Sequence, residues 1–82
     1  MFSRDEIIWV SAVKYALGRR SYVVGITSEY MIRRMDVMSP ECKHIMIRDI
    51  EKQEPFGYGD ECDRIEWMKL LDKLKESVDG VS

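Results

Sequence analysis

Apolar residues repeat at the spacing of an α-helix in the first part of the chain. Between residues 4 and 17 they cover most of the helix surface, which predicts the central and most buried helix of the fold. Ser3 and Glu6 have the spacing of a capping box, so this helix should begin just after Ser3. Gly18 and the two arginines after it predict its end, because glycine adopts a left-handed conformation easily and positive charge is favoured at a helix C-terminus.

The segment after Gly18 has a different pattern. Residues 21–24, SYVV, are aromatic and β-branched and predict a short extended piece that Gly25 closes. Thr27 is then predicted to be the N-cap of a short second helix that ends near Met38.

A third helix is predicted from the dipeptide Ser39-Pro40, which is typical of an N-cap followed by proline at the first helical position. Pro55 should end this helix at residue 53 or 54, because proline disfavours helical geometry in the residue before it. Residues 55–59, PFGYG, contain proline and two glycines and are predicted to form a loop that carries two aromatic side chains.

The last helix is predicted to begin at Asp60 or Asp63 and to end near Val78. Asp63 and Glu66 have the spacing of a second capping box. Its apolar stripe, which should face the core, consists of Trp67, Leu70, Leu71, Leu74 and Val78. Together these patterns predict a single all-α domain over residues 1–82, a small bundle of about four helices with at most one short extended segment.

Charge is distributed unevenly along the chain of 82 residues. Residues 1–38 carry six basic and four acidic side chains, whereas residues 39–82 carry seven basic and eleven acidic ones. Nucleic acid is therefore not an expected partner, because duplex binding needs a strongly basic surface. This distribution instead suits a protein that meets a basic partner, or one whose own two halves pair electrostatically.

The chain contains no predicted membrane segment, because its apolar runs are too short to cross a bilayer. Charged residues at positions 4–6 are not typical of a signal peptide. We therefore expect a cytoplasmic protein.

No residue pattern predicts catalysis, and the chain is expected to be neither an enzyme nor a cofactor-binding protein. Its single histidine, His44, would project about 200° away from Cys42 on a helix, which separates the thiol from the imidazole. An alternative is a zinc-stabilised structural module with Cys42, His44, Cys62 and a carboxylate of Asp60 or Asp63 as ligands.

Two regions contain the aromatic and charged residues that are enriched at protein interfaces. They are the end of the first helix and the loop before the last helix. On this basis the predicted partner-binding residues are Arg19, Arg20, Tyr22, Phe56 and Tyr58.

A small helix-turn-helix-like DNA-binding regulator is a second alternative. Ser21, Gly25 and Met31 fall loosely at the spacing of that motif. Arg33 and Arg34 would then lie on the recognition helix.

Three segments carry a resemblance to known proteins: residues 15–24 (YALGRRSYVV), residues 47–50 (IRDI) and residues 59–63 (GDECD) with Trp67. They resemble small open reading frames of phages and mobile elements of Gram-positive bacteria. The resemblance implies a biological setting and no catalytic residues. Small acidic phage proteins often act stoichiometrically on a host protein, and anti-CRISPR inhibitors are one such class, similar to this chain in size and setting.

This resemblance implies a phage-derived protein that binds and inhibits a host protein such as a Cas nuclease in the host cell. The contact would be made by the acidic second half together with residues 56–58. The acidic residues concerned are Asp60, Glu61, Asp63 and Glu66.

Overall fold

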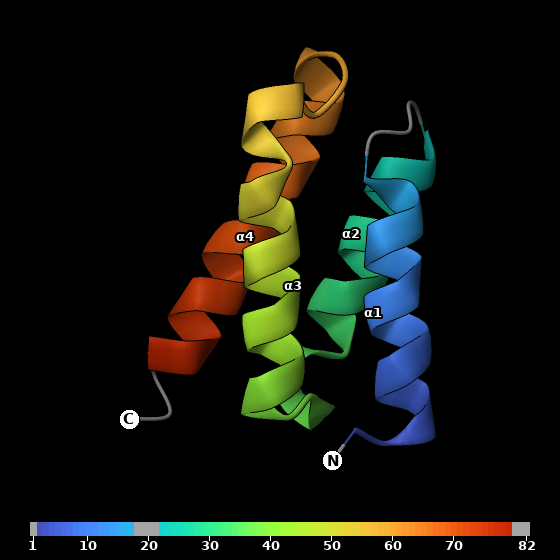
Figure 1. The fold of residues 1–82 in the computed structure, drawn as a ribbon, viewed down its shortest axis with the longest axis vertical. Helices are drawn as coiled ribbons and strands as arrows, with labels where there is room; N and C mark the ends of the chain where they lie inside the picture. The colour runs from blue at the N-terminus through green and yellow to red at the C-terminus, as the bar shows by residue number, and fades with distance from the viewer. Residues whose placement is uncertain (1, 18–21, 80–82) are drawn as a thin grey trace.

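A computed structural model of the chain describes residues 2–17 and 22–79 (Figure 1). It contains the helices α1 (Arg4–Ala16), α2 (Tyr22–Arg33), α3 (Pro40–Lys52) and α4 (Glu61–Asp79), and the short 3₁₀-helices η1 (Met35–Val37) and η2 (Glu54–Phe56). These two ranges contain no β-strand. The predicted fold class, a small all-α bundle with four helices, is confirmed.

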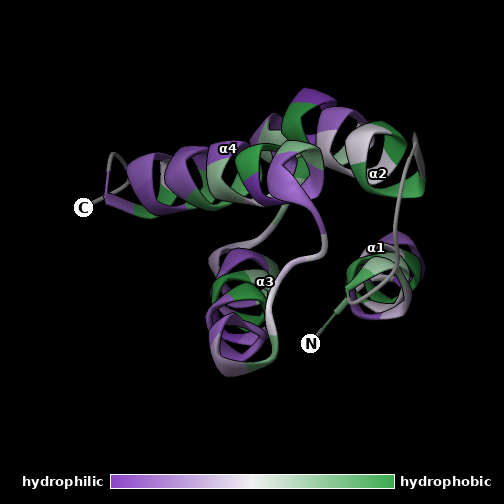
Figure 2. Cartoon of the chain, turned by 90° about the horizontal axis from the view of Figure 1, so that it is seen from above, coloured by the Kyte–Doolittle hydropathy of each residue, from purple (hydrophilic) through white to green (hydrophobic). Residues whose placement is uncertain are grey.

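The helices form two layers. α1 and α3 run side by side in one layer, and α2 and α4 form the other layer across them (Figures 1 and 2). α4 makes the two most extensive interfaces of the fold, with α2 and with α3. Two hydrogen bonds reinforce them: Ser28 Oγ donates to the Glu66 carbonyl (3.1 Å), and Lys43 Nζ donates to Ser77 Oγ (2.6 Å). The helix at the centre of the fold is therefore α4.

The prediction that the first helix is the central one was wrong. Trp9, Val13 and Ala16 of α1 are buried, but Ile7 and Ile8 are each more than half exposed. α1 lies at the edge of the bundle, where α2 and α3 pack against it. The rest of the bundle thus covers α1 on one side, and its two isoleucines remain exposed on the other.

The predicted start of α1 is confirmed. Ser3 Oγ accepts a hydrogen bond from the Glu6 N–H (3.2 Å), and Glu6 Oε1 accepts one from the Ser3 N–H (3.2 Å), which completes the capping box. The helix ends at Ala16. Gly18, the predicted stop residue, lies outside the described residues.

The prediction for the second helix was wrong in its start, its cap and its end near Met38, because α2 stops at Arg33 and the separate 3₁₀-helix η1 covers residues 35–37. Tyr22 to Val24 are helical, not extended, and α2 is continuous to Arg33. Thr27 lies inside this helix, where its Oγ1 donates to the Val23 carbonyl (2.7 Å), a bond that a helical threonine makes without capping anything. Val24 is fully buried, so packing outweighs the β-propensity of its sequence.

The start of α3 is confirmed by its cap, since Ser39 Oγ accepts a hydrogen bond from the Cys42 N–H (3.2 Å). The start of α4 is capped differently from the prediction. Asp60 Oδ1 accepts from the Asp63 N–H (3.0 Å), so Asp60 is the capping residue and the proposed box between Asp63 and Glu66 was wrong. Both of those residues lie within α4.

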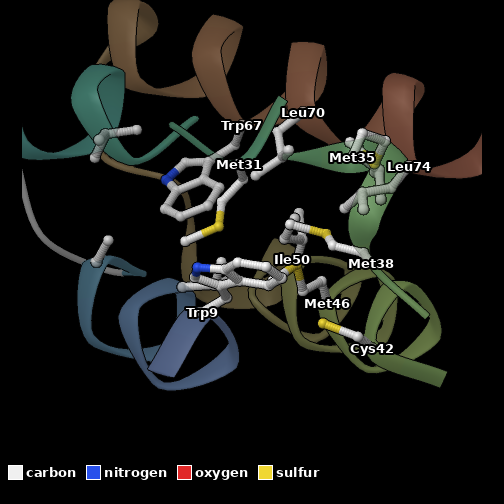
Figure 3. Close-up of a cluster of buried hydrophobic side chains, with 14 of the residues drawn as sticks. Trp9, Met31, Met35, Met38, Cys42, Met46, Ile50, Trp67, Leu70 and Leu74 are labelled. Carbon is white, nitrogen blue, oxygen red and sulfur yellow. The ribbon is translucent and has the colours of Figure 1, made fainter. Parts of the chain in front are cut away.

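All four helices contribute to one core, which is rich in methionine (Figure 3). Methionine is unbranched and fills irregular gaps between helices that cross at an angle. The labelled core residues include Trp9, Met31, Met35, Met38, Met46, Ile50 and Trp67. Of the predicted α4 stripe, Trp67, Leu70, Leu71 and Leu74 are buried, whereas Val78 is only partly buried.

Candidate protein-binding site

The turn between α3 and α4 presents the most exposed large apolar side chain in the described part of the protein. Phe56, at the end of η2, is 82% exposed. We call residues 53–61 the acidic turn. It lies at the upper end of α3 and α4 in Figure 1, where α3 gives way to η2 and α4 begins.

Hydrogen bonds within the acidic turn hold its backbone in one shape. The Phe56 N–H donates to the Gln53 carbonyl (2.9 Å), and the Gly57 N–H donates to the Glu54 carbonyl (3.1 Å). Gln53 Nε2 then donates to the Gly57 carbonyl (2.9 Å). Gly57 has a φ of 86°, a backbone conformation that glycine adopts easily and that residues with a Cβ atom disfavour. Phe56 is therefore displayed on a pre-organised turn.

Tyr58 anchors the acidic turn and does not face a partner, contrary to its assignment from the sequence. It is buried, and its hydroxyl donates to the Ile50 carbonyl in the last turn of α3 (2.8 Å). Burial raises the pKa of this phenol, and the carboxylates of Glu54 and Glu51 raise the pKa further.

Asp63 is also buried, so its assignment as a contact residue was wrong. Its side chain lies beneath the backbone of Gly59, where an added Cβ would be 2.5 Å from Asp63 Oδ2. Gly59 also has a φ of 100°. The absence of a side chain at position 59 is what lets Asp63 pack under the turn.

The exposed carboxylates of the acidic turn are those of Glu54, Asp60 and Glu61. None of these three takes part in an ion pair among the described residues. Asp60 and Glu61 were predicted as contact residues, whereas Glu54 was missed. Its place beside Pro55 in a turn that carries an aromatic residue was the available signal.

Of the other predicted contact residues, Glu66 is described by the structure and does not join this surface. Glu66 lies one turn further into α4, is half-buried and pairs with Lys69 (3.4 Å). Arg19, Arg20 and the side chain of Tyr22 lie outside the described residues.

The geometry of a helix-turn-helix motif is not found in the described residues. Gly25, which would have to form the turn, lies inside the continuous helix α2. Arg33 pairs with Glu29 (2.6 Å), and the guanidinium of Arg34 lies 3.5 Å from the centroid of the Tyr30 ring. The continuous helix α2 therefore contradicts the helix-turn-helix hypothesis.

The residues of the proposed zinc site are not brought together. Cys42 lies in the first turn of α3 and is fully buried, whereas Cys62 and His44 are exposed. No three histidine, cysteine, aspartate or glutamate side chains in residues 2–17 and 22–79 are placed to share a metal ion.

The two thiols are expected to differ sharply in reactivity. Burial, and secondly the negative charge of Glu6, raises the pKa of Cys42 to about 11, which suppresses its thiolate. At mildly alkaline pH a chromogenic disulfide reagent should therefore titrate one thiol per native chain and the second only after unfolding. Cys62→Ser should abolish the fast reaction. Two thiols that react together in the native protein would contradict the buried position of Cys42.

Comparison with known proteins gives no match: no family model, no curated protein and no solved structure matches this chain. None of the helices in the described ranges has the length and apolar character needed to span a membrane.

Proposed function

We propose that this protein binds a larger host protein through its acidic turn and inhibits it by covering a functional surface. The observation that carries the proposal is Phe56: a phenyl ring held in solvent on a hydrogen-bonded turn that also carries exposed carboxylates. A buried aromatic anchor surrounded by polar contacts is the usual organisation of an interface hot spot.

The shape of the turn favours tight binding because little ordering remains to be done on association. The turn's hydrogen bonds and the buried Tyr58 already hold the backbone of Phe56 in place. A specific interface covers about 800 Å² on each partner, so neighbouring parts of α3 and α4 would contribute as well.

The carboxylates of Glu54, Asp60 and Glu61 suggest the chemistry of the partner. Carboxylates steer a protein toward basic surfaces and raise its rate of association. A protein that holds nucleic acid presents such a surface in its binding channel. The most specific form of the proposal is a phage-derived anti-CRISPR inhibitor that occupies the nucleic-acid channel of a Cas nuclease.

Phe56→Ala is expected to weaken host-protein binding by about 30-fold or more, the effect of removing a hot-spot aromatic. Stability should change little because the ring is 82% exposed. The host protein is captured from a bacterial lysate, identified by mass spectrometry and purified, and its affinity for each variant is measured by calorimetry. Inhibition is tested in parallel as loss of target-DNA cleavage by purified Cas nucleases.

Two controls make this experiment specific. Val37→Ala removes an exposed apolar side chain from η1 and should leave binding unchanged. Glu54→Lys with Glu61→Lys should slow association, whereas Arg33→Glu with Arg34→Glu should spare it. Binding that persists in the Phe56→Ala variant, or that is lost only in the arginine variant, would reject the acidic turn as the contact.

A further inference from the structure

A second exposed apolar feature lies between α1 and α2, on helices that do not form the acidic turn. It is a groove of about 230 Å³, lined chiefly by Ile8, Trp9, Ala12, Ile26, Tyr30 and Met31. Ile26 is 62% exposed and Ile8 57% exposed, so the walls of the groove are open to solvent. We call it the α1–α2 groove.

We propose that the α1–α2 groove receives Phe56 of a second copy of this chain, so that the protein associates head to tail. The volumes are compatible, because a cavity of about 150 Å³ lined by aliphatic side chains is enough to hold benzene. The phenyl ring would exchange exposure to water for contact with Ile8, Ile26 and Tyr30, which removes apolar surface from solvent on both molecules.

Charge complementarity supports this occupant. Ile26 and Tyr30 also line an adjoining hollow bordered by Glu29, Arg33 and Arg34, which gives that rim an excess of positive charge. The pair between Arg33 and Glu29 is largely solvent-exposed and therefore weak, so little free energy is lost if Arg33 exchanges Glu29 for a carboxylate on another molecule.

The incoming turn carries the opposite charge. The acidic turn that displays Phe56 also carries the exposed carboxylates of Glu54, Asp60 and Glu61. Insertion of the ring between Ile26 and Tyr30 would bring these carboxylates toward Arg33 and Arg34. Opposite charges around an apolar anchor favour this orientation over contact between two like surfaces.

The contact must join different molecules. The acidic turn connects α3 directly to α4 and is tied to α3 by the Tyr58 hydroxyl, so it cannot swing onto the groove of its own chain (Figure 1). Each copy offers one turn and one groove, which makes the interface heterologous and allows rings or open chains. The inference does not depend on the proposed host protein, although both contacts would use Phe56.

Two variants, each lacking one half of the contact, test the inference. Phe56→Ala leaves the groove intact but removes the phenyl ring that would enter it. Ile26→Asp leaves Phe56 intact but places a charge in the groove. Sedimentation velocity over a wide concentration range should show self-association of the natural chain and a dissociation constant raised by at least about tenfold for each variant alone. An equimolar mixture of the variants should form a 1:1 dimer, because one intact turn meets one intact groove and nothing further can add.

The other outcomes overturn the inference. A natural chain that stays monomeric would reject it, as would a mixture of variants that does not associate. Self-association retained by Phe56→Ala but lost by Ile26→Asp would show groove-to-groove contact instead. Circular dichroism checks that both variants fold. Ile26→Asp should bind the host protein normally, so failure of self-association and failure of host binding are read separately.

Discussion

Trp67→Ala is expected to lower the free energy of unfolding by about 3 to 5 kcal/mol, the range for removing a large buried aromatic side chain. Trp67 is fully buried in the cluster of Figure 3, on the helix that packs against both α2 and α3. Its Nε1 has no hydrogen-bond partner among the described residues, so the expected loss is one of packing. A chain of this length has a total stability of about 4 to 12 kcal/mol, so the variant should be close to unfolding.

Urea titration followed by circular dichroism measures this effect without relying on tryptophan fluorescence, to which Trp67 contributes beside Trp9. Ile65→Ala is the matched control, because Ile65 lies on the same helix and is half exposed; its cost should stay within about 0.5 kcal/mol. Trp67→Phe keeps a ring in the core and should cost less than alanine. A loss below about 1 kcal/mol for Trp67→Ala, with an unchanged slope, would contradict the core position of the indole.

The helix starts that were predicted correctly depend on residues close together in the sequence. A cap is made by a side chain and a backbone N–H three positions away, as at Ser3 and Ser39. Such a contact forms whatever the rest of the chain does. The end of α3 before Pro55 is equally local.

The start of α2 could not be predicted from its own residues. Among its described side chains, the buried face consists of Val24, Ser28 and Met31, which follow each other at helical spacing. Serine at the second of these positions interrupts the apolar pattern. Ser28 tolerates burial because its hydroxyl donates to the Glu66 carbonyl of α4, a partner 38 residues away. That contact exists only in the folded protein.

The candidate site was predicted only in part for a similar reason. The sequence cannot distinguish which of Phe56 and Tyr58 is exposed, since they are aromatic residues two positions apart in one loop. The positive φ of Gly57 lies between them, and only Tyr58 reaches the Ile50 carbonyl. Asp63 was likewise indistinguishable from its acidic neighbours until the space beneath Gly59 was known.

Glu6 connects the start of α1 to the start of α3. This buried carboxylate accepts hydrogen bonds from the backbone N–H groups of Ser39, through Oε2, and of Ser3, through Oε1. Ser39 is itself the cap of α3, so Glu6 holds two helix starts together where α1 and α3 lie side by side (Figure 1). The hydrogen bond from Ser39 is the main cause that lowers the pKa of Glu6 below its ordinary value of 4.5, against the opposing effect of burial.

A lowered pKa makes the contribution of Glu6 to stability depend on pH. The contribution is complete above pH 4.5, where the carboxyl is ionised in both the unfolded and the folded chain. As the pH falls below that value, the unfolded chain binds the proton first, and stability is lost until the pH has passed the lower pKa of the folded state. Glu6→Gln should therefore cost about 1 to 3 kcal/mol at neutral pH and much less in strong acid.

The measurement is the difference in free energy of unfolding between the natural chain and Glu6→Gln, obtained by urea titration at a series of pH values. Taking the difference cancels the titration of the other carboxylates, which both proteins share. Asp5→Asn is the matched control: Asp5 is exposed in the same first turn of α1, and its favourable interaction with the helix dipole is worth only about 0.3 to 1 kcal/mol. A difference for Glu6→Gln that does not shrink between pH 7 and strong acid would mean that the carboxylate charge does not stabilise the two helix starts.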